Sequence, residues 1–138
     1  MIILDTNVLS ALMRPAADRA VVDWLNRQPT VSVWTTSVTI LEVWFGLKIL
    51  APGKRRVLLM GAFEKLINEI GGRVVSFDSA AANHASDLLA SRHRKGRPAD
   101  LRDTMIAGIV IAHRATLATR DIRHFDDLPV SVINPWDS

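Results

Sequence analysis

Short apolar runs alternate with longer amphipathic stretches along the chain. The apolar and β-branched runs predict strands, at residues 1–4, 31–35, 73–77, 116–119 and 130–133. The longer stretches carry apolar residues at helical spacing and predict helices, at about residues 6–13, 16–27, 37–50, 54–70, 78–92 and 100–113. Because short strands alternate with helices, we expect βαβ units: an α/β fold with a parallel sheet and helices on both faces.

The composition is that of one globular domain, which we place at residues 1–138. Hydrophobic residues make up 49% and charged residues 22%, which excludes a disordered or fibrous protein. The chain has no cysteine, so disulfides, thiolate zinc sites and cysteine nucleophiles are excluded. The longest apolar run, Met105–Ala112, is much shorter than the roughly 20 residues of a membrane-spanning helix. The start, MIILD, lacks the basic segment of a secretory leader, and we expect a cytoplasmic protein.

The charge balance points to a polyanionic partner. Seventeen Lys and Arg residues against fourteen Asp and Glu residues give a formal net charge of +3, and the sequence pI is about 10.0. Most of these bases are arginines, which bind phosphate with two parallel hydrogen bonds. Nucleic acid is therefore a candidate partner.

Two acidic residues lie just beyond the ends of predicted strands. Asp5 comes after the apolar run of residues 1–4, and Asp121 comes two residues after the strand that ends at Thr119. In parallel sheets, functional residues gather beyond the carboxyl ends of the strands. Each acid alone is also typical of a turn or a helix cap.

A third acid, Glu42, lies within an apolar stripe of its predicted helix. The stripe consists of Val38, Leu41, Phe45 and Ile49, and we expect it to face the core. A carboxylate there is costly unless it is paired or bound to a cation. The alternative is a capping box that begins at Thr39, although Ser37 is an equally good cap and would place Glu42 inside the helix.

The fourth candidate acid is Asp103, in the first turn of the helix that begins near Asp100. Acids are favoured in a first turn because they complement the helix dipole. That explanation suits Asp100, the natural N-cap, at least as well. We therefore expect Asp100 to cap the helix and Asp103 to project into a site.

Four carboxylates without cysteine or clustered histidine suit a hard cation, Mg²⁺ or Mn²⁺. Without these four, 17 basic side chains face 10 acidic ones on the rest of the chain. A divalent ion within a basic surface indicates phosphodiester hydrolysis.

The same residues resemble a known family, the PIN domain, and within it the VapC-type toxins of the FitB-like branch of bacterial toxin–antitoxin systems. The resemblance covers residues 1–136 and rests on the order and spacing of five short segments, namely LDTNVLS at 4–10, LEV at 41–43, Asp103 with Ile106-Ala107, TRD at 119–121 with His124-Phe125, and INPW at 133–136.

The resemblance implies a Mg²⁺-dependent ribonuclease with a doubly wound, five-stranded, mainly parallel sheet. It implies a homodimer that a cognate antitoxin holds inactive, in a complex of higher order. Such an antitoxin has a DNA-binding segment and an inhibitory C-terminal tail.

Matched to the family, the catalytic and metal-binding acids are Asp5, Glu42, Asp103 and Asp121. Many relatives carry Asn at the position of Asp121. The neutral polar residues Thr6, Asn7 and Thr119 match positions that orient waters or carboxylates around the site.

A basic run precedes the helix of Asp103 and is the candidate RNA-binding segment, with Arg92, Arg94, Lys95 and Arg97. The alternative is a solvated helix end whose bases complement the dipole. We interpret a second run, Lys54–Arg56, as ordinary surface. Trp136 is expected to pack against the sheet, and His124 to have a structural or surface role.

Two other functions fit parts of the pattern. A haloacid-dehalogenase-like phosphatase also begins with a strand that ends in an acid, but it needs a second Asp where this chain has Asn7. A catalytically inactive PIN-like module that only binds nucleic acid or protein is the remaining alternative. Retention of all four acids favours the enzyme.

Overall fold

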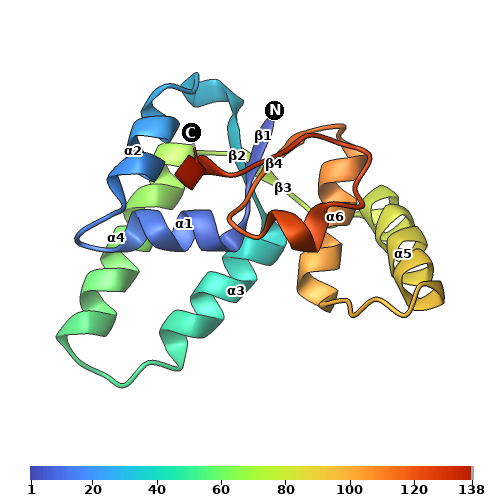
Figure 1. Cartoon of the computed structure of the whole chain (residues 1–138). Helices are drawn as coiled ribbons and strands as arrows, with labels where there is room; N and C mark the ends of the chain where they lie inside the picture. The colour runs from blue at the N-terminus through green and yellow to red at the C-terminus, as the bar shows by residue number, and fades with distance from the viewer. Residues whose placement is uncertain (138) are drawn as a thin grey trace.

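Five parallel strands form the middle layer of the protein (Figure 1). The computed structural model describes residues 1–137, and within them the strands pair in the order β3-β2-β1-β4-β5. All four neighbouring pairs are parallel. The strands are β1 (Ile2–Leu4), β2 (Val33–Thr36), β3 (Val74–Val75), β4 (Thr116–Ala118) and β5 (Val132–Ile133). The predicted α/β class is confirmed, with strands slightly shorter than expected.

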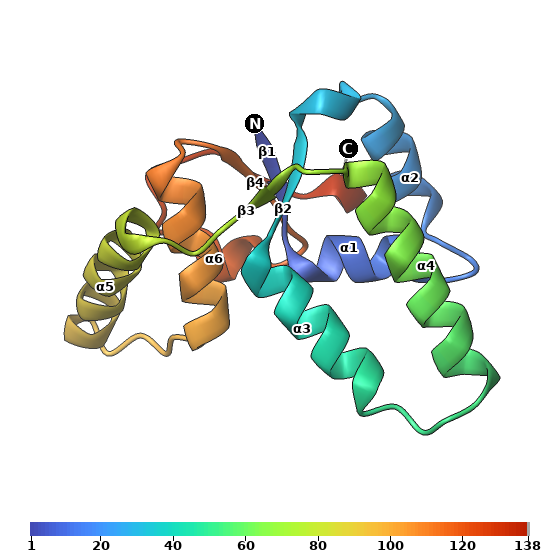
Figure 2. The ribbon, with the colours of Figure 1, turned by 180° about the vertical axis from the view of Figure 1, so that it is seen from behind.

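Helices cover both faces of this sheet, as predicted (Figures 1 and 2). One face carries α1 (Thr6–Met13), α2 (Arg19–Asn26), α3 (Ser37–Lys48) and α4 (Lys54–Ile70), and the other carries α5 (Ser79–Arg94) and α6 (Leu101–Ala112). Short 3-10 turns are η1 (Thr30–Ser32), η2 (Ile122–Phe125) and η3 (Pro135–Asp137). Helix α2 begins later than predicted because the Asp18 carboxylate caps it by accepting from the Ala20 N–H. None of the described helices is both long and apolar enough to cross a membrane.

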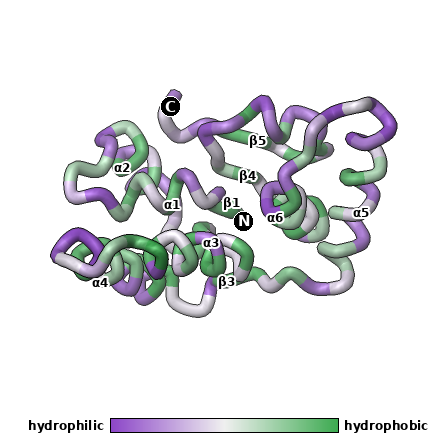
Figure 3. The backbone as a smooth tube through the Cα atoms, turned by 90° about the horizontal axis from the view of Figure 1, so that it is seen from below, coloured by the Kyte–Doolittle hydropathy of each residue, from purple (hydrophilic) through white to green (hydrophobic). Residues whose placement is uncertain are grey.

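Each face of the sheet has its own hydrophobic core, because neighbouring strand residues point to opposite sides. Ile3 and Leu117 pack with α5 and α6, whereas Leu4 and Ala118 pack with α1 to α4. Figure 3 shows hydrophobic residues along β1 and β4 between the layers. These two strands are therefore covered by helices on both faces.

Helices α5 and α6 pack tightly against each other at Gly108. A Cβ atom at this position would lie 2.4 Å from the carbonyl oxygen of Ala81 and 2.9 Å from Cβ of Ala85. Only glycine permits this approach. The contact fixes α6, whose first turn carries Asp103.

The prediction that the apolar stripe Val38, Leu41, Phe45 and Ile49 of α3 faces the core is wrong for three of its four residues. Leu41, Phe45 and Ile49 are exposed, at 61%, 54% and 67%. The buried residues of α3 are Val38, Thr39, Val43 and Leu47. Because apolar residues occupy both faces of this helix, the pattern did not distinguish the buried face from the exposed one.

The start of α3 also differs from both expectations. The cap is Thr36, whose hydroxyl accepts from the Thr39 N–H at 3.0 Å. Thr39 therefore begins no capping box, and Glu42 lies inside the helix.

Candidate active site

The candidate site lies where β1 and β4 end side by side. The chain leaves β1 toward β2 on one side of the sheet and returns to β4 on the other. Such a switch of direction opens a crevice at the carboxyl ends of the strands. Asp5 follows β1 and donates its backbone N–H to the carbonyl of Ala118 at 2.9 Å. Thr119 follows β4 directly, so the two side chains meet in the crevice.

Asp5 is 4% exposed and both of its carboxylate oxygens are engaged. Oδ1 accepts from the Thr6 N–H and Oδ2 from the Thr119 hydroxyl, each at 2.8 Å. Burial raises the pKa of Asp5 to about 6, with smaller contributions from the charges of Asp103 and Glu42. The two hydrogen bonds oppose this rise. Asp5 is thus a buried carboxylate that a cation would stabilise.

Thr119 is completely buried and connects three polar groups. Its hydroxyl donates to Asp5 and accepts from the Asp121 N–H at 3.0 Å and from Nδ2 of Asn7 at 3.3 Å. Asn7 Nδ2 also donates to Oδ2 of Asp121 at 3.1 Å. Thr6, Asn7 and Thr119 therefore lie among the acids, where the sequence placed them.

Glu42 reaches the site from α3 and is mostly buried, with 17% of its side chain exposed. Oε1 accepts from the Thr6 hydroxyl at 3.0 Å. Oε2 lies 3.8 Å from Nε of Arg102, on α6. Glu42 is thus partly compensated by groups of the chain itself.

Asp103 approaches from α6, one turn after the Asp100 cap. Asp100 accepts from the Asp103 N–H at 3.0 Å, so the predicted cap is confirmed. Burial raises the pKa of Asp103, and the charges of Asp100, Glu42 and Asp121 add to this effect. His124 opposes it; its Nδ1 lies 3.8 Å from Oδ2 of Asp103.

The acids line a cavity of about 370 Å³. Three of the four predicted acids are in its wall, namely Asp5, Asp103 and Asp121. Two arginines, Arg14 and Arg120, line the same cavity. A second cavity, of about 530 Å³, shares Asp103 and includes Arg97 and Arg123. Carboxylates and arginines thus line the same cavities, a combination suited to a phosphate chain.

Residues 2–130 match the PIN domain family. The chain belongs to this family. It is 36% identical over 138 residues to VapC ribonuclease Y4jK of Sinorhizobium fredii, with 99% of both chains covered. It is 33% identical to Toxin FitB of Neisseria gonorrhoeae, again with 99% of both chains covered. A solved structure of FitAB bound to a DNA fragment superposes with a TM-score of 0.88 at 32% identity, and covers 99% of this chain and 96% of that one.

The metal-binding prediction for this PIN domain is only partly matched by its geometry. Within residues 1–137, no three His, Cys, Asp or Glu side chains lie close enough together to hold a metal ion. The predicted cluster of four carboxylate ligands is therefore not observed. Glu42 instead contacts Thr6 and Arg102, and Asp121 contacts Asn7. The donor set still fits Mg²⁺, which keeps several waters and binds through one or two carboxylates.

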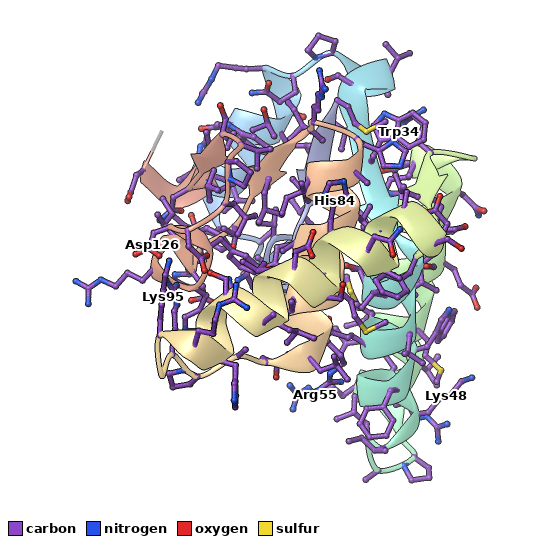
Figure 4. All side chains as sticks on the ribbon, turned by 90° about the vertical axis from the view of Figure 1, so that its right-hand side faces the viewer. Trp34, Lys48, Arg55, His84, Lys95 and Asp126 are labelled. Carbon is purple, nitrogen blue, oxygen red and sulfur yellow. The ribbon has the colours of Figure 1, made fainter. Side chains whose placement is uncertain are left out.

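The predicted RNA-binding run of the PIN domain divides into two groups. Arg92 is 3% exposed and bonds to Asp127, so RNA contact by Arg92 does not fit its position. Arg97 pairs with Asp126 at 2.7 Å at the edge of the second cavity. Arg94 and Lys95 are exposed, and Figure 4 shows Lys95 on the same side of the molecule as Asp126. These two remain candidates for RNA contact.

The second basic run, Lys54–Arg56, opens α4 at the loop from α3, far from the strand ends (Figures 1 and 4).

Sequence reasoning missed three basic residues of the site: Arg14, Arg102 and Arg120. Arg102 comes directly before Asp103, and Arg120 lies between Thr119 and Asp121. Their nearness to the acids in sequence was the available signal. Nothing in the sequence showed that Arg102 faces Glu42.

Proposed function

We propose that this PIN domain, residues 1–138, is the toxin of a toxin–antitoxin system and acts as a Mg²⁺-dependent ribonuclease in the cytoplasm. The observation that carries the proposal is the pair of half-buried and buried carboxylates, Asp103 and Asp5, in one cavity with arginines. Similarity over the whole chain to a VapC ribonuclease and to Toxin FitB supports it.

Asp5 and Asp103 are the residues that would hold the ion, with Glu42 and Asp121 beside them. Bound there, Mg²⁺ or Mn²⁺ neutralises phosphate oxygens and makes a water a better nucleophile. Thr6 and Thr119 keep the Asp5 carboxylate in one orientation through their 2.8 Å hydrogen bonds. Arg14 and Arg120 attract the RNA backbone toward the acids.

The cognate antitoxin is the proposed protein partner. The solved structure of FitAB bound to a DNA fragment supports a partner of this kind. We propose that an inhibitory tail enters the acidic cavity, where an arginine pairs with two carboxylates in place of the metal. The toxin is expected to be a homodimer, and to form a larger assembly with the antitoxin.

The test combines purified protein with total bacterial RNA, transfer RNA included, at several Mg²⁺ and Mn²⁺ concentrations. We expect cleavage that EDTA abolishes and that Asp103→Asn lacks. Expression without antitoxin should arrest growth, and co-expression should relieve the arrest. A folded protein that binds Mg²⁺ and RNA but leaves the RNA intact would favour the inactive binding module.

A further inference from the structure

One wall of the acidic cavity consists of an arginine and a tryptophan in contact. The guanidinium carbon of Arg120 lies 4.8 Å from the centroid of the Trp136 ring. Both residues line the cavity that contains Asp5, Asp103 and Asp121. This distance is that of a cation–π contact. The proposed hydrolysis gives Trp136 no role, because a neutral indole neither coordinates Mg²⁺ nor forms an ion pair with phosphate.

One member of the pair, Arg120, is held by a polar residue that also contacts the acids. The backbone N–H of Arg120 donates to Oδ1 of Asn7 at 3.3 Å, and the side-chain nitrogen Nδ2 of Asn7 donates to Asp121. The backbone N–H of Trp136 donates to Oδ1 of Asn134 at 2.9 Å. The backbone of Arg120 is therefore tied to Asp121 through Asn7, and the backbone of Trp136 is held by a local bond to Asn134.

The charge of Arg120 is available to a ligand. Within residues 1–137, no carboxylate lies within ion-pair distance of its guanidinium, and the residue is exposed. Arg97, by contrast, is paired with Asp126 and Asp127. Trp136 is partly buried against the α1–α4 core, so its ring is supported from behind.

We propose that Arg120 and Trp136 form a stacking platform for the nucleobase next to the scissile phosphate of single-stranded RNA. This inference rests on the proposed nuclease function and adds a binding site to it. Unstacked bases are recognised by aromatic rings and by the flat face of arginine. With the phosphate at the acids, the neighbouring base reaches Arg120 and Trp136, which line the same cavity.

The test separates base contacts from backbone contacts. An Asp103→Asn background prevents cleavage, and two short labelled RNAs serve as probes: one with bases and one of equal length that is abasic throughout. We expect the base-containing RNA to bind roughly ten-fold more tightly. Arg120→Ala and Trp136→Leu should lose this preference. The matched control Arg14→Ala, which lines the same cavity without a ring contact, should weaken both RNAs equally.

A second measurement guards against misfolded variants. Trp136→Phe keeps an aromatic ring, and it should retain the preference while losing the part of the fluorescence quenching that base stacking on Trp136 produces. If Arg120→Ala and Trp136→Leu melt like the parent and keep the full preference, the platform is wrong. If the parent binds both RNAs equally but the wild type still cleaves RNA, the platform fails and the nuclease function stands. Absence of both binding and cleavage overturns both.

Discussion

Arg92 and Asp127 form a buried, two-pronged ion pair. Nε and one terminal nitrogen of Arg92 each donate to a different Asp127 oxygen at 2.9 Å. The guanidinium also donates to the His124 carbonyl and to the Thr104 hydroxyl. A single side chain of α5 thus joins α6 to the loop around η2. These bonds hold the backbone of His124, whose imidazole lies 3.8 Å from the Asp103 carboxylate.

Arg92→Gln is expected to destabilise the protein by about 3 kcal/mol, since removing one partner leaves the other charge uncompensated. Arg92 also holds the pKa of Asp127 below its usual value of 3.8. The pair therefore stabilises fully above that value, and its contribution is lost as the pH falls through the lowered pKa. Urea unfolding at neutral and acid pH measures the difference, which should shrink in acid. The exposed control Arg94→Gln should stay within about 0.5 kcal/mol of wild type. Equal stability of both variants at pH 7 would contradict the assignment.

Asp103→Asn should reduce RNA cleavage more than about 100-fold, because it removes a proposed metal-binding carboxylate. Asp100→Asn should keep most of the activity, since Asn caps helices as well as Asp does. Asp100 is the N-cap of α6 and Asp103 lies in its first turn, so the two positions form a matched pair. Cleavage assays on proteins of equal melting temperature decide between them. Equal inactivity of both would mean that Asp100 acts on the substrate.

Metal-free protein is expected to lose stability as the pH rises from about 4 to about 6. Asp5 has a pKa of about 6 in the fold against an ordinary 3.8. In this range the folded state keeps a proton that the unfolded chain has released, so stability falls with increasing pH. Carboxyl carbon NMR in EDTA should show the Asp5 titration near 6, and Mg²⁺ should lower it. A midpoint near 3.8 without metal would refute the described burial.

Thr119→Val keeps the shape of a buried side chain and removes its hydroxyl. We expect a loss of about 1–3 kcal/mol, because the donors of Asn7 and Asp121 lose their acceptor. Cleavage should fall about 10- to 100-fold as Asp5 loses an orienting bond. The pKa of Asp5 should rise further, since the Thr119 bond lowers it. Thr119→Ser restores the hydroxyl and should recover most activity; failure to recover would assign the effect to packing.

Gly108→Ala should cost about 1–3 kcal/mol, because its methyl group would meet the Ala81 carbonyl. The control is Gly61→Ala in α4, where a Cβ has open space. That variant should gain about 1 kcal/mol from better helix propensity. Thermal melts of the two variants should shift in opposite directions. A neutral Gly108→Ala would show that α5 and α6 separate easily.

Strand and helix order was predictable because each element carries its own pattern of apolar residues, and several helices begin at a capping aspartate. Thr6–Met13 and Lys54–Ile70 match the predicted helices fully, and Asp78 and Asp100 cap the helices assigned to them. The positions of the acids followed from a general property of parallel sheets.

Side-chain partners were not predictable, because they depend on contacts between distant segments. Arg92 belongs to a run that looks solvated, and only the fold brings Asp127, 35 positions later, against it. The exposed face of α3 was missed for a related reason: Leu41, Phe45 and Ile49 are as apolar as the residues that α3 buries.

The hydrogen bond between Asp5 and Thr119 spans 114 positions of sequence. During translation Asp5 is synthesised early and Thr119 late. The crevice exists only after β4 has paired with β1. Until residue 119 has been synthesised and has entered the sheet, a nascent chain has Asp5, Glu42 and Asp103 but lacks Thr119 and Asp121. The proposed site therefore forms only late in synthesis, after β4 has joined β1. The order of the strands thus sets the earliest stage of translation at which the site can exist.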